Sequence, residues 1–273
     1  MQAQGNEVHS VLSATDFNVR DYARSAVGSY RAQLNLAAFE SAPLKPDTLR
    51  VLRYAVAIER ATMGHLRNVL VTATHKDARV TAFLGTWAFE KFWIADALES
   101  IVDAHGADAP PAIEHKPSIA AQIADRFRPI ARSISAAHYK TDMVSVHMVM
   151  GTIDEWLMQA ALTRLETLDP NPELLRSLGL ILPVKVRQLS FFEQQARARL
   201  SESPRTQAVV RKHIRTSDWP IGAGAEPRGE TAYFYQHLFS PAVADVAALD
   251  ARIDSLPGQA GLGLIARATG RHA

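Results

Sequence analysis

Two glutamates and two lysines are the residues of this sequence best placed to do chemistry together. Glu59, Lys91, Glu155 and Lys185 each interrupt an apolar stripe, one in each of four helix-length segments. Residues three, four and seven positions apart share one face of a helix, so each charge falls in the middle of a buried face. Because burying an unpaired charge costs several kcal/mol or more, we expect the four side chains to meet.

We expect the stripes to line any pocket around these charges and to make it hydrophobic. They comprise Leu52, Val56, Glu59, Met63, Leu66 and Leu70; Leu84, Trp87, Ala88, Lys91, Ile94, Ala95 and Leu98; Met148, Gly151, Glu155, Met158 and Leu162; and Leu178, Ile181, Lys185, Gln188, Leu189 and Phe192. We expect Trp87, Ile94, Met158, Gln188 and Phe192 to contact a substrate. Most of the neighbouring aromatic residues, Phe89, Phe92, Trp93, Trp156, Phe191 and Phe192, are expected in the core. Pro183, two residues before Lys185, is expected to bend its helix and widen the site.

The elements that position these residues are helices, since helical periodicity dominates and strand alternation is nearly absent. We expect helices over residues 16–40, 46–75, 77–104, 117–137, 142–168, 172–201 and 204–215, and one or two more within 230–268. The long helices fall into two hairpins, which predicts an all-α bundle over residues 1–216. Residues 217–273, rich in Gly and Pro at their start, are expected to wrap the surface as part of the same domain.

Composition narrows the class of protein further. The 273 residues contain no cysteine, which excludes disulfides, thiolate metal sites and cysteine nucleophiles. The formal net charge is only +2 with well-mixed charges, so a nucleic-acid-binding surface is not indicated. The sequence has no signal-peptide pattern and no membrane-spanning apolar run. We therefore expect a cytoplasmic protein with no nucleic-acid or membrane partner.

Three segments resemble those of a known family. The sequence WAFEKFWI at residues 87–94 resembles the W-x-x-E-E-x-x-H segment of ferritin-like di-iron carboxylate proteins, especially soluble acyl-carrier-protein desaturases and their actinobacterial relatives. KVRQ at 185–188 stands where that family has E-x-R-H, and GTIDEW around Glu155 is also similar. The resemblance covers residues 46–200 and implies a ferritin-like four-helix bundle with additional helices.

The departures from that pattern change the chemistry that it implies. The family site takes one Glu from each of two helices and Glu-x-x-His from the other two, whereas this chain has Lys91, Ile94, Lys185 and Gln188 at four of these ligand positions. A protonated ammonium has no lone pair and repels cations. We therefore expect no metal and no cofactor, with two Glu–Lys ion pairs in place of the metals. Unconventional ligands remain an alternative: His147, Glu90, Asp154 and Glu193.

The favoured function is a metal-independent enzyme acting on a hydrophobic small molecule by cyclisation, isomerisation or another redox-neutral rearrangement in specialised metabolism. A desolvated lysine can act as an acid or base or form a Schiff base, and Glu59 and Glu155 could complement it. The alternatives are a non-catalytic binding or scaffold protein and a di-iron oxygenase or oxidase with unconventional ligands.

The substrate could be free or tethered to a carrier protein. The basic segment with Arg205, Arg211, Lys212 and Arg215 suits an acidic carrier, although a solvated helix face explains it as well. A homodimer is the default expectation for such a bundle.

Overall fold

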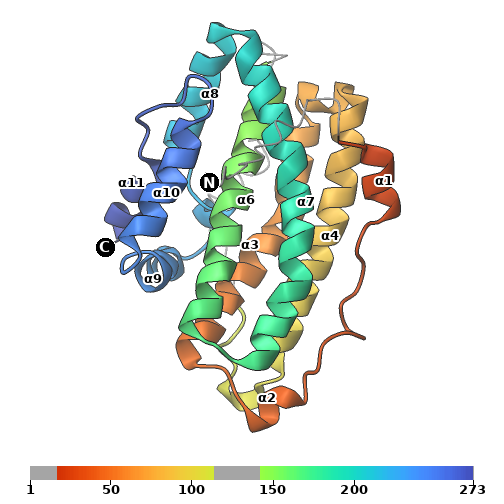
Figure 1. Cartoon of the computed structure of the whole chain (residues 1–273), viewed down its shortest axis with the longest axis vertical. Coiled ribbons are helices and arrows are strands. Elements are labelled where there is room, and N and C mark those ends of the chain that lie inside the picture. The colour runs from red at the N-terminus through yellow and green to blue at the C-terminus, as the bar shows by residue number, and fades with distance from the viewer. Residues whose placement is uncertain (1–16, 114–141, 273) are drawn as a thin grey trace, which may run out of the picture.

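The computed structural model describes residues 17–113 and 142–272, and within these ranges every regular element is a helix (Figure 1). The helix expected at 117–137 lies outside the described residues. The helices are α1 (Val19–Arg24), α2 (Ala38–Ser41), α3 (Pro46–Leu70), α4 (Ala78–Asp103), α6 (Asp142–Leu168), α7 (Pro172–Glu202), α8 (Pro204–Thr216), α9 (Arg228–Leu238), α10 (Val243–Asp254) and α11 (Leu264–His272), with short 3₁₀ turns η1 (Ala73–Lys76), η2 (Gly106–Asp108) and η3 (Ala223–Ala225). The all-α class is thus confirmed for the described residues.

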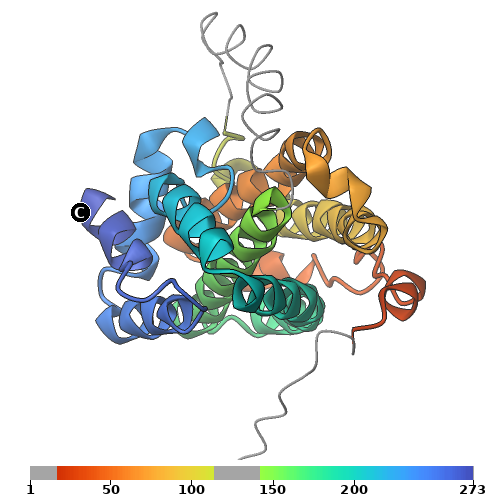
Figure 2. The same ribbon diagram turned by 90° about the horizontal axis from the view of Figure 1, so that it is seen from above.

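Four long helices, α3, α4, α6 and α7, form the bundle in the two hairpins expected from the sequence (Figures 1 and 2). Their ends carry the expected signals. Asp77 caps α4 by accepting the N–H of Val80, and Asn171 caps α7 by accepting the N–H groups of Glu173 and Leu174. α3 ends earlier than expected, at Leu70, before η1.

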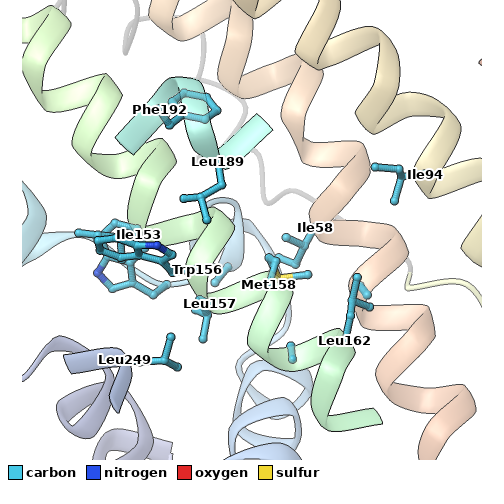
Figure 3. Packing of buried hydrophobic residues seen from close by; sticks show 14 of the residues in the cluster. Ile58, Ile94, Ile153, Trp156, Leu157, Met158, Leu162, Leu189, Phe192 and Leu249 are labelled. Carbon is cyan, nitrogen blue, oxygen red and sulfur yellow. The ribbon is translucent and has the colours of Figure 1, made fainter. Parts of the chain in front are cut away.

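Helix α6 is buried on nearly all sides along its middle, where residues 151–158 are all buried. One side packs against α7, and α8, α9 and α10 pack against other parts of the helix. Figure 3 shows Ile153, Trp156 and Leu157 on the side that faces Leu249 of α10. The C-terminal helices therefore complete the core around α6.

The N-terminal part of the chain differs from the expected helix over 16–40. Only α1 and α2 are helical there, and residues 25–37 run alongside α4 without forming a helix (Figure 1). The N–H of Val27 donates to Glu90 and the N–H of Asn35 donates to Glu173. Hydrogen bonds to side chains of α4 and α7 therefore replace those of a helix.

The glycine-rich segment 218–227 is also different from the expected surface coil. Trp219, Ala223 and Glu226 are buried, and a Cβ at Gly222 would lie 2.8 Å from the side chain of Ala61 in α3. Gly222 has a φ of +103°, a backbone conformation that other residues rarely adopt. The segment is wedged between α3 and the C-terminal helices, of which there are three instead of one or two. Within the described ranges, no helix is both long and apolar enough to cross a membrane.

Candidate functional site

Glu59, Lys91, Glu155 and Lys185, hereafter the quartet, meet at the centre of the four-helix bundle. The ammonium of Lys91 lies 2.6 Å from Glu59 and 3.5 Å from Glu155, and that of Lys185 lies 2.8 Å and 3.0 Å from the same two carboxylates. The expectation that the four charges meet is confirmed. Instead of two separate ion pairs, each glutamate contacts both lysines.

The quartet is closed off from solvent, with at most 1% of each residue exposed. The indole N–H of Trp87 donates to Glu155 at 3.1 Å, and Lys91 Nζ lies 5.6 Å from the centre of the Trp87 ring. Trp87, which was expected to line a pocket, therefore orients a carboxylate of the quartet.

A third carboxylate, Asp154, stands beside the quartet at 3.9 Å from Lys91. It is buried, and its other oxygen accepts the backbone N–H of Ile221 at 2.7 Å. From the sequence, Asp154 was expected only as an alternative metal ligand. The structure instead makes it the link between the quartet and the 218–227 segment.

The charges of this site fix one another's ionisation. Burial alone would lower the pKa of Lys91, but the carboxylates of Glu155 and Glu59 outweigh it and raise that pKa above its ordinary value. Burial would likewise raise the pKa of Glu155, yet Lys185 and Lys91 hold it below its ordinary value. For Asp154 burial prevails over the attraction of Lys91 and raises the pKa to about 6. Lys91 is thus an ammonium, not the neutral amine that a Schiff base requires.

The other expected substrate contacts are part of the packed interior. Ile94, Met158 and Phe192 are buried in the hydrophobic core, where Figure 3 shows them among its apolar side chains. Gln188 is also buried, and its amide donates to Glu90 at 3.0 Å rather than to the quartet. A substrate pocket among these residues stays a prediction.

Several sequence expectations around the site are wrong in detail. Met63 is exposed, although its stripe placed it inward, and so are Phe89 and Phe92, which were expected to be candidates for the core. Pro183 lies on the exposed side of α7, and the helix continues through it. The bend expected at this proline stays a prediction.

Glu90, considered from the sequence only as an alternative metal ligand, has a structural role that the sequence did not indicate. It is 0% exposed, and it lies on a different side of α4 from the quartet, facing the N-terminal segment. An acidic residue between Phe89 and Lys91 gives little sign of burial. Its burial could be predicted only if a second side of α4 were known to be buried. The sequence does not show that another part of the chain covers that side.

The two remaining alternative metal ligands, Glu193 and His147, are engaged elsewhere. Glu193 forms an ion pair with Arg197 at 2.9 Å, and His147 Nδ1 lies 2.8 Å from the Thr74 hydroxyl. Across residues 17–113 and 142–272, no cluster of three or more His, Cys, Asp or Glu side chains is arranged to hold a metal ion.

A cavity of about 800 Å³ lies near the C-terminal helices, away from the quartet. Its lining residues are Asp218, Trp219, Ala223, Gly224, Glu226, Arg228, Gly229, Thr231, Ala232 and Ala268. The wall formed by residues 218–224 is the segment that Asp154 holds through Ile221. The quartet and the cavity therefore share a structural connection.

Comparison of the chain with protein-family models, curated proteins and solved structures gives no match. The ferritin-like resemblance consequently rests on the motifs in residues 46–200 and on the order of the four charged helices.

Proposed function

We propose that this chain is a ferritin-like bundle in which a structural charge cluster occupies the place of a metal site, and that it acts as a non-catalytic binding or scaffold protein. The observation that carries this proposal is the closure of the quartet. Both glutamates contact both lysines, and almost no part of the four residues is exposed. The raised pKa of Lys91 also disfavours a lysine base or nucleophile.

The test compares the quartet with a version that carries no charge. The neutral variant combines Glu59→Gln, Glu155→Gln, Lys91→Met and Lys185→Met. If the quartet is structural, this variant folds and restores the metabolite profile of a host strain from which the protein has been deleted. A variant that folds but fails to restore that profile would overturn the proposal. The charges would then be required for the activity of the protein although they are not required for its folding.

A second candidate is the metal-independent enzyme acting on a hydrophobic small molecule, and Asp154 favours it. A buried carboxyl with a pKa of about 6, only 3.9 Å from the Lys91 ammonium, can exchange a proton near neutral pH. The apolar residues Ile94, Met158 and Phe192 nearby would suit a substrate without charge. In the deleted host, Asp154→Asn should then abolish restoration of the metabolite profile while the protein stays folded.

The basic residues of α8 are the part of the chain that could bind an acidic carrier protein. Of the basic residues on α8, Arg211 donates to the carbonyls of Gly258 and Ala260, whereas Lys212 and Arg215 are exposed. Lys212 and Arg215 would contact an acidic carrier protein if one delivers the ligand. Co-purification of the wild type, but not of Lys212→Glu/Arg215→Glu, with an acyl-carrier protein would support this.

The di-iron alternative has a direct test. Elemental analysis after expression in iron-supplemented medium would support it if iron were bound near two equivalents per chain. Such a result would overturn the structural role of the quartet.

A further inference from the structure

Residues 17–31, hereafter the strap, cross the side of the bundle where α4 and α7 meet. The ring of Tyr22 stacks on Phe83 of α4 at a centroid distance of 5.1 Å, and the ring of Phe17 contacts Phe191 of α7 at 5.2 Å. Figure 1 shows α1 and the segment after it alongside α4. The strap thus covers the seam between one helix of each hairpin.

Glu90 holds the strap to this seam. Its carboxylate accepts the hydroxyl of Tyr22 at 2.5 Å and the backbone N–H of Val27 at 3.1 Å from the strap, and it accepts Arg187 at 2.8 Å and Gln188 at 3.0 Å from α7. Four donors from two separate parts of the chain therefore meet on one buried carboxylate. Hydrogen bonds to a charged acceptor are about twice as strong as neutral ones.

The position of this contact relates it to the quartet. Glu90 precedes Lys91 directly on α4, and Gln188 lies three residues after Lys185 on α7. Lifting the strap would uncover the bundle at the level of the quartet.

Besides Glu90, two arginines of the bundle hold the strap: Arg79 donates to the carbonyl of Phe17 at 2.7 Å, and Arg187 donates to the carbonyl and hydroxyl of Ser25 at 3.2 Å and 2.9 Å. Much of the strap is nevertheless open to solvent. Of its residues only Tyr22 and Tyr30 are buried, and most of the others are exposed. The Tyr30 hydroxyl is buried and has no hydrogen-bond partner among the described residues, so its desolvation is not offset there. Segments with few buried contacts and little regular structure open at low free-energy cost compared with the core.

We propose that the strap is a detachable cover of the α4–α7 seam and that Glu90 is its latch. The strap opens as a unit while the bundle stays folded, and it closes when Tyr22 and Val27 bind Glu90 again. This inference goes beyond the proposed function, because it holds whether the quartet is structural or catalytic. In the enzyme alternative, the opened seam is the route by which a small molecule reaches the buried quartet.

Amide hydrogen exchange tests the latch directly, because the N–H of Val27 itself binds Glu90. Glu90→Gln keeps the shape of the side chain but removes its charge, and Tyr22→Phe removes one donor. We expect both to speed exchange over residues 20–31 by about tenfold or more, with exchange in α6 unchanged. Glu230→Gln is the matched control, because it weakens the pair of hydrogen bonds that Arg50 donates to Glu230 far from the strap.

The proposal is overturned if the strap of the wild-type protein exchanges only at the rate of α6, or if Glu90→Gln leaves the strap unchanged. The first outcome would mean that the strap opens only when the whole bundle unfolds. The second would mean that Glu90 is not the latch.

A thiol probe measures access to the seam, since the natural chain contains no cysteine. Phe83→Cys places a thiol beneath Tyr22, and Leu162→Cys places one in the core away from the strap. Adding Glu90→Gln should raise the rate of reaction with iodoacetamide about tenfold or more at position 83 and not at position 162. Equal acceleration at both positions would show bundle unfolding and would contradict a detachable cover. If Phe83→Cys does not fold, the exchange measurements decide the question.

Discussion

The stability of the quartet depends on having two positive charges for its two negative charges, as Lys185 illustrates. Its ammonium contacts Glu59 and Glu155 and is 0% exposed, so neither glutamate has water to replace it. Lys185→Met should lower the free energy of unfolding by about 3–5 kcal/mol, the cost of leaving a buried charge without its partner. Urea denaturation measures this effect. Lys212→Met, on an exposed side of α8, should change stability by less than about 0.5 kcal/mol. A similar small loss for Lys185→Met would contradict the ion-pair geometry.

Asp154 predicts a particular dependence of stability on pH. Its pKa is raised by burial from an ordinary 3.8 to about 6, so between these values the folded protein keeps a proton that the unfolded chain releases. Folding stability should therefore fall as pH rises from about 4 to about 6, by up to about 3 kcal/mol, and stay level above that range. Glu155, whose pKa is lowered, acts in the other direction and loses its contribution only as pH falls below its ordinary value of 4.5.

Asp154→Asn isolates that effect, because it removes the titrating group and keeps an oxygen for the N–H of Ile221. The decline in stability between pH 4 and 6 should disappear in urea melts of this variant. Asp245→Asn, on the exposed surface of α10, should retain it. A decline of the same size in Asp154→Asn would assign it to other groups.

At the scale of single residues, the sequence predicted that the quartet meets but did not predict the burial of Glu90. The difference lies in whether a residue's own position in the sequence pattern already implies that it is buried. The cost of a lone buried charge required Glu59, Lys91, Glu155 and Lys185 to meet, whatever the details of the fold. The burial of Glu90 had no such signal, since its donors come from segments distant in sequence.

At the scale of helices, α6 packs tightly against α7 at Gly151, where no side chain separates the α6 backbone from the ring of Phe192. A Cβ added there would fall inside the van der Waals radius of the Phe192 ring. Gly151→Ala should lower the free energy of unfolding by about 1–3 kcal/mol through overpacking. Gly64→Ala in α3, where nothing lies within 4 Å of the new Cβ, should raise it by up to about 1 kcal/mol.

Thermal and urea denaturation of both glycine variants provide the comparison. Combining Gly151→Ala with Phe192→Leu should recover part of the loss by removing the ring edge. No recovery would locate the strain elsewhere in α6.

Helix prediction succeeded where the signal was local and failed where distant contacts decided the backbone. Pro46 and Pro172 begin their helices at the expected residues because a proline favours the first turn of a helix, a signal that acts within one turn. The helix expected over 16–40 does not form as one element, since its N–H groups bind Glu90 and Glu173 from other helices. Met63 is exposed because the apolar stripe of α3 does not keep its inward direction toward the end of the helix.

On the scale of the whole molecule, α6 makes the N-terminal bundle and the C-terminal helices interdependent. Its middle is buried on one side by α7 and elsewhere by the helices that follow residue 203. Arg252 of α10 lies over the ring of Trp156, with its Cζ 4.9 Å from the ring centre. The sequence could not predict this arrangement. The later helices are short, and the fit of their side chains against α6, rather than their apolar periodicity, decides which helices they contact.

Leu249 of α10 tests whether the C-terminal helices unfold together with the bundle. It packs toward α6, and Leu249→Ala should lower the free energy of unfolding by about 2–5 kcal/mol through the lost contacts and the cavity that remains. If the two parts form one cooperative unit, circular dichroism and tryptophan fluorescence should give the same urea midpoint, and both midpoints should shift together. Val243→Ala, 73% exposed on the same helix, should leave both unchanged. Separation of the two midpoints in Leu249→Ala would mean that α9 to α11 unfold independently, and α6 would then have to remain folded with one of its sides open to water.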